Sequence, residues 1–136
     1  MFVKNIKPAR FLRGFDNEIK IIFELKSVWR AGQLWGNRVY FSPERLSLWN
    51  QKKDLPENQQ DKSNAFSIGL IILQMSNPSF KVEDMQHFNR EKHSLHEELI
   101  TFSKKYKRLS QVLEKLLCFY PKGRFDLLQA YNLMVR

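Results

Sequence analysis

Two histidines and a glutamate lie close together in the second half of the chain and are its first candidates for metal chemistry. His93 and His96 are three residues apart, and Glu97 follows directly. On a helix such residues occupy neighbouring positions of the surface. Two imidazoles do not make a zinc site, however, and no fitting cluster of cysteines or aspartates accompanies them. We therefore expect exposed helix residues here and no bound metal.

The nucleophilic side chains lack the partners that hydrolytic catalysis needs. Ser27, Ser42 and Ser110 have no convincing general base in the sequence, so a serine–histidine–aspartate triad is unsupported. Cys118 lies on an apolar helical stripe, which indicates an inert core thiol. A single cysteine also excludes a disulfide framework and favours a reducing, intracellular setting, which we take to be the cytoplasm.

Positive charge dominates the chain. The formal net charge is +9, and residues 1–53, with eleven basic and four acidic side chains, contribute +7 of it. A second basic run extends from Lys104 to Arg108. It fits a nuclear-import or polyanion-binding patch, but a solvated junction between two helices is the more common origin of such a run. Residues 1–53 also contain aromatic residues between the basic ones, a pattern that can bind along a phosphate backbone. These residues are Phe11, Phe15, Trp29 and Trp35. No recognisable nucleic-acid module accompanies this charge, so nucleic-acid binding is the weaker alternative.

Length and composition predict one soluble domain over residues 1–136. A chain of 136 residues can enclose one hydrophobic core, and 43% apolar residues make it too hydrophobic for a disordered tail. The longest apolar stretch, Ala65 to Met75, is well short of the roughly 20 residues that a bilayer requires. Residues 1–4 lead into charged sequence without a readable secretion signal. We expect no membrane association.

The elements that position these residues are mostly helices. Residues 11–22 predict two short strands around a turn, and residues 23–42 predict a long loop. Ser42-Pro43-Glu44 predicts the start of a short helix, with Ser42 as its N-cap and Pro43 in its first position. Residues 50–60 predict a polar loop. Hydrophobic periodicity predicts later helices in four places: 81–90, 92–104, 109–117, and 125–135 with Leu128, Tyr131 and Leu133 among its apolar positions.

Between these elements, residues 61–76 predict a buried central helix. Apolar side chains occupy nearly every face of this segment, which is typical of a helix surrounded by others. Gly69 costs about 1 kcal/mol relative to alanine in a helix, which indicates the close approach of a neighbouring segment. The predicted class is therefore mainly α, built around this helix, with a short β-hairpin near the N-terminus.

Four segments, in this order, resemble parts of eukaryotic protein kinases. Asn5-Ile6-Lys7-Pro8, followed by Phe11-Leu12 and Ile19-Lys20-Ile21, is similar to the catalytic loop and the strands after it, H-R-D-I-K-P-x-N-I-L and I-K-I-x-D-F-G. Lys7 is more typical of the serine/threonine branch. The other segments resemble the end of the activation segment, G-T-x-x-Y-x-[AS]-P-E, the hydrophobic helix F and the D-P-x-x-R turn: Gly36 to Glu44, Asp61 to Met75 and Tyr120 to Arg124.

The resemblance implies the helical C-terminal lobe of a kinase, without the nucleotide-binding N-lobe, and the family uses ATP and Mg²⁺. Asn5 stands where the family has its catalytic aspartate, and Arg10 stands where it has a metal-binding asparagine. Phe23 stands at the first position of the D-F-G motif. An amide cannot act as a general base, which often contributes about 10²- to 10⁴-fold, and a guanidinium repels Mg²⁺. We expect no phosphoryl transfer and no cofactor.

The structural half of the family pattern is better preserved. Glu44 and Arg124 match the ion pair that ties the activation segment to the turn before the last helix. Asn64 stands where helix F bears an aspartate that holds the catalytic loop, and Ser67 and Gly69 match the same helix motif. The resemblance implies a non-catalytic kinase relative that binds a protein partner or associates with itself. The alternatives are a fragment of a longer serine/threonine kinase and a basic polyanion-binding domain.

Overall fold

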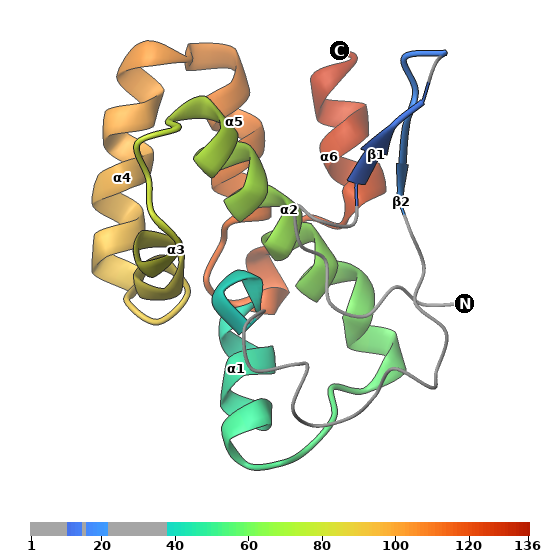
Figure 1. The fold of residues 1–136 in the computed structure, drawn as a ribbon, viewed down its shortest axis with the longest axis vertical. Helices are drawn as coiled ribbons and strands as arrows, with labels where there is room; N and C mark the ends of the chain where they lie inside the picture. The colour runs from blue at the N-terminus through green and yellow to red at the C-terminus, as the bar shows by residue number, and fades with distance from the viewer. Residues whose placement is uncertain (1–10, 15, 22–37) are drawn as a thin grey trace.

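The computed structural model describes residues 11–14, 16–21 and 38–136, and within these ranges the chain is mainly helical, as expected (Figure 1). Two short strands come first, β1 (Phe11–Arg13) and β2 (Ile19–Ile21). Short 3-10 turns lie at Arg38–Tyr40, Glu57–Gln59 and Pro121–Gly123. The described ranges contain six α-helices: α1 (Pro43–Asn50), α2 (Gln60–Ser76), α3 (Val82–Phe88), α4 (Lys92–Lys105), α5 (Lys107–Leu116) and α6 (Leu127–Met134).

The strand pair agrees with the turn chemistry of the sequence. β1 and β2 are antiparallel, with Arg13 opposite Ile19. Asn17 adopts a φ of 62°, a left-handed conformation that asparagine tolerates better than most residues. Its side-chain oxygen also accepts a hydrogen bond from the Arg13 guanidinium at 2.8 Å, and the Gly14 N–H donates to the Glu18 carbonyl at 2.8 Å. These contacts close the hairpin.

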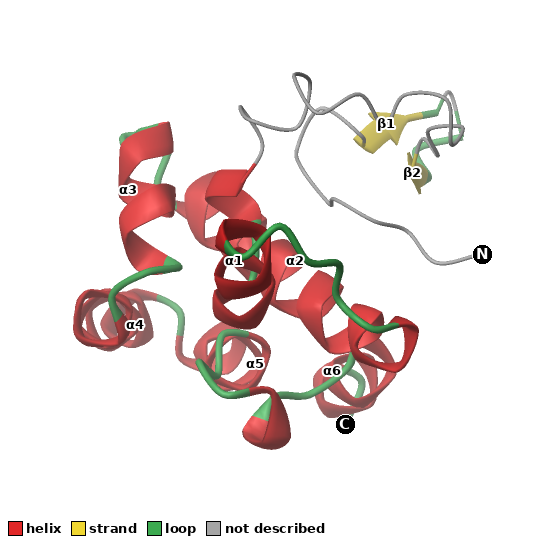
Figure 2. Cartoon of the chain, turned by 90° about the horizontal axis from the view of Figure 1, so that it is seen from below, coloured by secondary structure: helices red, strands yellow, loops and turns green. Residues whose placement is uncertain are grey.

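Helix α2 is the buried centre of the helical body. In Figure 2 it lies between α1, α5 and α6, while α3 and α4 lie on the side away from α6. Its packed side chains are completely enclosed: Ala65, Phe66, Leu70 and Leu73. The helix begins at Gln60, one residue before the predicted start, and the buried Gln60 amide donates to the Leu55 carbonyl at 2.8 Å. The prediction of a buried central helix is confirmed.

Gly69 marks the place where α5 ends against this helix. A Cβ atom at Gly69 would lie 2.8 Å from Cγ and Cδ2 of Leu117 and 3.2 Å from Cβ of Leu116. Both leucines are buried, so neither has room to withdraw. The close approach predicted from the glycine is therefore present, and its neighbour is the C-terminal end of α5.

Helix α6 differs from the sequence expectation. It is shorter than predicted and begins after Asp126, whose carboxylate accepts a hydrogen bond from the Gln129 N–H at 2.8 Å. Only Ala130 is fully buried on this helix, whereas Leu128 and Tyr131 are 68% and 62% exposed. Apolar residues occupy two flanks of α6, and only the flank of Ala130 faces the core.

Candidate functional site: a buried polar junction

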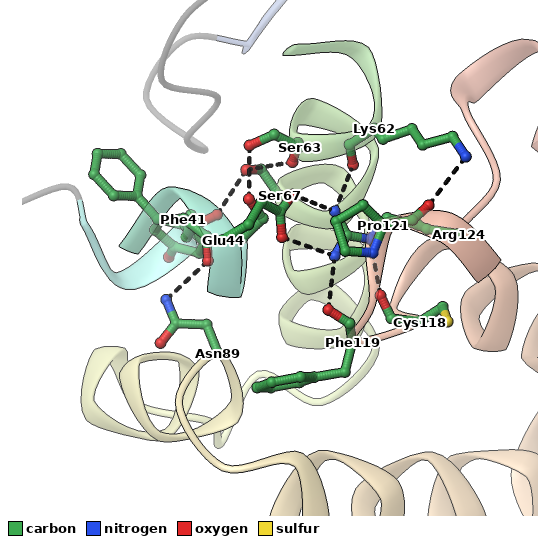
Figure 3. A network of polar contacts seen from close by, with 12 residues as sticks. Phe41, Glu44, Lys62, Ser63, Ser67, Asn89, Cys118, Phe119, Pro121 and Arg124 are labelled. Carbon is green, nitrogen blue, oxygen red and sulfur yellow. Dashed lines mark hydrogen bonds and ion pairs between the residues drawn. The ribbon is translucent and has the colours of Figure 1, made fainter. Parts of the chain in front are cut away.

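Arg124 lies at the centre of a polar junction that joins α1, α2 and the segment 117–124 (Figure 3). Its side chain is completely buried and forms a two-pronged ion pair with Glu44. Nη1 donates to Oε1 at 2.7 Å, and Nη2 donates to Oε2 at 3.1 Å. Such bidentate pairs are stronger and more directional than single contacts. The structure thus brings Glu44 and Arg124 into the ion pair that their positions in the two motifs predicted.

The remaining donors of Arg124 bind backbone carbonyl oxygens. Nε donates to Cys118 at 2.8 Å, Nη1 to Lys62 at 3.0 Å and Nη2 to Phe119 at 3.1 Å. Together with the carboxylate, these acceptors occupy all the N–H groups of a guanidinium. The Phe66 ring lies beneath the same group, 4.8 Å from Cζ. Arg124 can therefore remain charged in the core while it satisfies carbonyls that follow the end of α5.

The start of α1 places Glu44 opposite Arg124. Pro43 occupies an early helical position, and Glu44 follows in the first turn, where the helix dipole favours a negative charge. Ser42 is the N-cap residue but does not cap the helix with its side chain, contrary to expectation. Its buried hydroxyl lies 2.7 Å from Oγ of Ser63 on α2. The contact with α2 thus replaces the predicted cap.

Helix α2 holds the preceding segment through two further polar contacts. The Ser67 hydroxyl donates to the Tyr40 carbonyl at 2.6 Å, and the Tyr40 hydroxyl donates to Oε1 of Gln74 at 2.6 Å. Burial raises the pKa of the Tyr40 phenol above its ordinary value, and the bond with Gln74 opposes part of that rise. Ser67, singled out from its motif position, is therefore a structural anchor for residues 40–42.

Asn89, which the sequence analysis missed, fixes the same segment from the opposite side. Its Nδ2 group donates to the carbonyl oxygens of Arg38, Val39 and Phe41 at 2.9 to 3.0 Å. The side chain is 1% exposed and lies directly after α3. An asparagine before a polar stretch resembles an ordinary turn residue, so its long-range contacts left no local signal.

The residues that would carry catalysis in the resembling family lie outside the described residues: Asn5, Lys7, Arg10 and Phe23. Residues 23–37 of the loop predicted over 23–42 lie outside as well, together with Phe15, Ser27, Trp29 and Trp35, and the described end of that loop contains the 3-10 turn Arg38–Tyr40. Asn64 is described and buried on α2. All residues described for the junction therefore lie between positions 38 and 124.

The candidate metal and nucleophilic residues are dispersed. Nε2 of His93 lies 3.1 Å from Oε1 of Glu97, and both side chains are exposed, as expected. Within residues 11–14, 16–21 and 38–136, no group of three or more His, Cys, Asp or Glu side chains could hold a metal ion. The Ser110 hydroxyl donates to the Lys107 carbonyl of its own helix at 2.7 Å.

Cys118 is not the core thiol that the sequence predicted. It follows the end of α5, is half-buried, and lines an open pocket of about 390 Å³ between α4, α5 and residues 117–123. The periodic stripe continues past Leu116, but the helix does not, and this places Cys118 outside the helical face. His96 lies on the wall of the same pocket.

The structure also contains a contact between a serine and a histidine that the sequence did not predict. The Ser94 hydroxyl lies 2.8 Å from Nε2 of His87 and joins the end of α3 to the start of α4. Among the described contacts no carboxylate accepts a hydrogen bond from His87, so nothing orients the imidazole as in a catalytic triad. The contact connects two helices on the surface.

The junction supplies hydrogen bonds and charge pairing between its own groups, and the guanidinium at its centre is completely buried. Its chemistry is that of a structural site.

No protein-family model matches the chain, and no curated protein matches it significantly. Among the described helices, none combines the length and the apolar content that a membrane crossing demands.

Proposed function

We propose that this chain is the C-terminal lobe of a protein kinase-like fold that has lost phosphoryl transfer and acts as a protein-interaction module. The ion pair between Glu44 and Arg124 is the observation that carries the proposal. The two residues are 80 positions apart and occupy the P-E and D-P-x-x-R positions of the resembling motifs. Their bidentate contact is the one that the resemblance implied.

The central helix gives independent support. The motif S-x-G falls on Ser67 and Gly69, and both have a structural use. Ser67 holds the backbone of Tyr40, while Gly69 admits the end of α5 at van der Waals distance. These contacts support a scaffold in which α2 organises the segment before α1 and the turn before α6.

The loss of catalysis follows from residue types. Phosphoryl transfer needs a positioned nucleophile and metal-held phosphates. The amide of Asn5 cannot accept the proton of an attacking hydroxyl, Arg10 places a cation at a metal position, and Phe23 removes the D-F-G carboxylate. Each change acts on a different contributor, so restoring one would not restore the reaction. The proposed protein therefore uses neither ATP nor Mg²⁺.

An interaction role is supported by the surface of α6. Exposed apolar side chains are contiguous along one flank of this helix: Leu127, Leu128, Tyr131, Met134 and Val135. Contiguous apolar surface on a folded domain commonly marks a site that another molecule covers. The proposed module binds a partner with this face.

A thermal-shift measurement with Mg²⁺-ATP tests the loss of nucleotide binding. A ligand that binds only the folded state, at a hundredfold excess over its dissociation constant, stabilises a protein by about 2.7 kcal/mol. We expect no change of the melting temperature at millimolar ATP, with or without Mg²⁺. A saturable rise that requires Mg²⁺ would contradict the proposal. An active kinase, measured in parallel, provides the positive control.

A further inference from the structure

The exposed flank of α6 is uncharged as well as apolar. At 3.6 residues per turn, its five apolar side chains fall within one arc of about 120°, while Ala130 and Leu133 lie on the other side of the helix and pack on the core. No charged residue occurs between Leu127 and Val135. We call this surface, formed by Leu127, Leu128, Tyr131, Met134 and Val135, the α6 flank.

A row of cations begins where the α6 flank ends. Arg108, in the first turn of α5, donates from Nη2 to the Met134 carbonyl at 3.0 Å, so the end of α6 lies against the start of α5. Figure 1 shows the α4–α5 turn and the C-terminus at the same end of the molecule. We call the five exposed cations of this end the basic edge: Lys104, Lys105, Lys107, Arg108 and Arg136.

The basic edge is not neutralised by acidic neighbours. None of its five cations forms an ion pair within the part of the chain that the structure describes. The acidic residues of the same helices lie away from this edge: Glu97 and Glu98 precede the last turn of α4, Glu114 lies in the second half of α5, and Asp126 precedes α6. Positive charge is therefore concentrated at one end of an otherwise uncharged apolar face.

From this arrangement we infer that the α6 flank and the basic edge form one docking surface for an amphipathic helix of a partner protein that continues into an acidic segment. The apolar face of the partner helix packs along α6, and its carboxylates cross the basic edge. Charge complementarity of this kind accelerates association and fixes the register of binding. The inference extends the interaction role proposed above and rests on it.

A second copy of the chain fits this surface less well. In a symmetric dimer the same patch meets itself. A parallel arrangement would bring two basic edges together, and an antiparallel one would set each basic edge against the start of α6, where Asp126 is the one acidic residue between positions 115 and 136. A membrane surface fits less well, because interfacial helices carry lysine and arginine along their length, whereas α6 carries none from Leu127 to Val135. Single-stranded nucleic acid would find only one aromatic ring, Tyr131, for base stacking on this flank.

Fluorescence anisotropy with designed peptides tests the surface on the full chain. The probes are a leucine-striped amphipathic helix with four glutamates appended at its C-terminus, the same helix with the glutamates at its N-terminus, and matched peptides with glutamine in place of glutamate. We expect saturable binding of at least one acidic peptide and at least tenfold weaker binding of its glutamine counterpart. Binding of the acidic peptide should weaken steeply with added salt.

Charge-reversal variants assign that binding to the basic edge. Lys104→Glu, Lys105→Glu and Lys107→Glu combined should weaken binding of the acidic peptide at least tenfold. The matched control combines the same type of change at exposed lysines elsewhere: Lys52→Glu, Lys53→Glu and Lys81→Glu. Because the net charge changes equally in both variants, a general electrostatic attraction would weaken both alike, whereas the proposed surface loses affinity only in the first.

A third variant tests the apolar half of the surface. Leu128→Asp alters a side chain that is 68% exposed, so it should leave the melting temperature unchanged and weaken peptide binding at least fivefold. Equal weakening by the two triple variants, no effect of Leu128→Asp, or no saturable binding at millimolar peptide would overturn the inference. Tighter binding to phosphatidylserine vesicles or to an oligonucleotide would overturn it too. A Mg²⁺-ATP shift with intact peptide binding would instead overturn only the non-catalytic role.

Discussion

Glu44 and Arg124 are 80 residues apart in the chain and meet in a two-pronged ion pair in which the guanidinium is completely buried. The pair joins the first turn of α1 to the turn before α6. The same guanidinium binds three backbone carbonyls, one of them on α2. One side chain thus connects three elements of the helical body.

Removing the carboxylate of this pair should strongly destabilise the fold. Glu44→Ala leaves Arg124 buried with a positive charge and no counter-ion, and breaking a buried pair in this way costs about 3 to 5 kcal/mol. We expect the midpoint of urea unfolding to fall accordingly, with an unchanged denaturant slope.

Two further variants separate the ion pair from helix effects. Glu57→Ala removes an exposed carboxylate from another first turn and should shift the midpoint little. Glu44→Gln keeps the shape and one acceptor oxygen but loses the charge, so it should lie between wild type and Glu44→Ala. An unfolding midpoint of Glu44→Ala equal to that of wild type would contradict the structural role of the pair.

The contact between α2 and α5 at Gly69 should not tolerate a methyl group. A Cβ atom there would lie 2.8 Å from Cγ of the buried Leu117. Overpacking of this kind costs about 1 to 3 kcal/mol. The change from glycine to alanine gains only about 1 kcal/mol in helix propensity, which does not compensate for it. Gly69→Ala should therefore lower the free energy of unfolding, measured by urea titration.

The same substitution should behave differently when the opposing side chain is trimmed. In a Leu117→Ala background the clash is absent, so Gly69→Ala should be neutral or stabilising there. The double-mutant cycle isolates the interaction between the two positions. Equal effects of Gly69→Ala in both backgrounds would show that the close approach is not the reason for the glycine.

The Asn89 amide should be needed as a donor and not merely as a polar group. Asn89→Ala removes the donor that the carbonyls of Arg38, Val39 and Phe41 share. The Arg38 carbonyl keeps the Phe41 N–H, but the other two lose this donor, and each buried unsatisfied group costs about 1 to 3 kcal/mol. Asn89→Asp should be worse, because it turns a carboxylate toward these oxygens. Amide hydrogen exchange of Phe41 and the unfolding midpoint both report the loss; a milder effect of Asp than of Ala would contradict the assignment.

The carboxyl group of Glu98 should make stability fall with rising pH over a narrow acidic range. Burial, and secondarily the charge of Asp84, raise the pKa of Glu98 in the folded state. As the pH rises past about 4.3, the Glu98 carboxyl loses its proton in the unfolded chain before it does so in the folded chain. The unfolded state is therefore increasingly favoured until the carboxyl of the folded state ionises as well. The free energy of unfolding should decrease in that window.

The variant Glu98→Gln should remove this contribution. Its unfolding free energy, measured between pH 4 and pH 6 at roughly 0.1 M salt, should lack the decrease attributed to Glu98, as judged by the difference from wild type. The exposed Glu97→Gln is the matched control, because it changes the neighbouring residue of the same helix. Identical pH profiles for wild type and Glu98→Gln would contradict the raised pKa.

The sequence predicted those parts of the fold that depend on local periodicity and composition. The central helix was readable because apolar residues surround it, and Gly69 predicted a close neighbour because glycine is unfavourable inside a helix. Both features follow from side-chain types at fixed spacing, and both are present in the structure.

Features that depend on tertiary contacts were harder to predict. Ser42 has the chemistry of an N-cap, but its hydroxyl contacts Ser63 across the helix interface. Leu128 and Tyr131 fit an amphipathic pattern, yet pattern alone cannot tell which of two apolar flanks faces the core. Asn89 binds a segment 48 to 51 residues away and has no local signature.

The proposed loss of phosphoryl transfer from a kinase-like scaffold is tested most directly by a transfer assay with labelled γ-phosphate. The purified full chain, with Mg²⁺ or Mn²⁺ and generic protein acceptors, should transfer no label, and Asn5→Asp should not restore transfer, because Arg10 and Phe23 remain. Label transferred by the wild-type chain and abolished by Asn5→Ala would contradict the account.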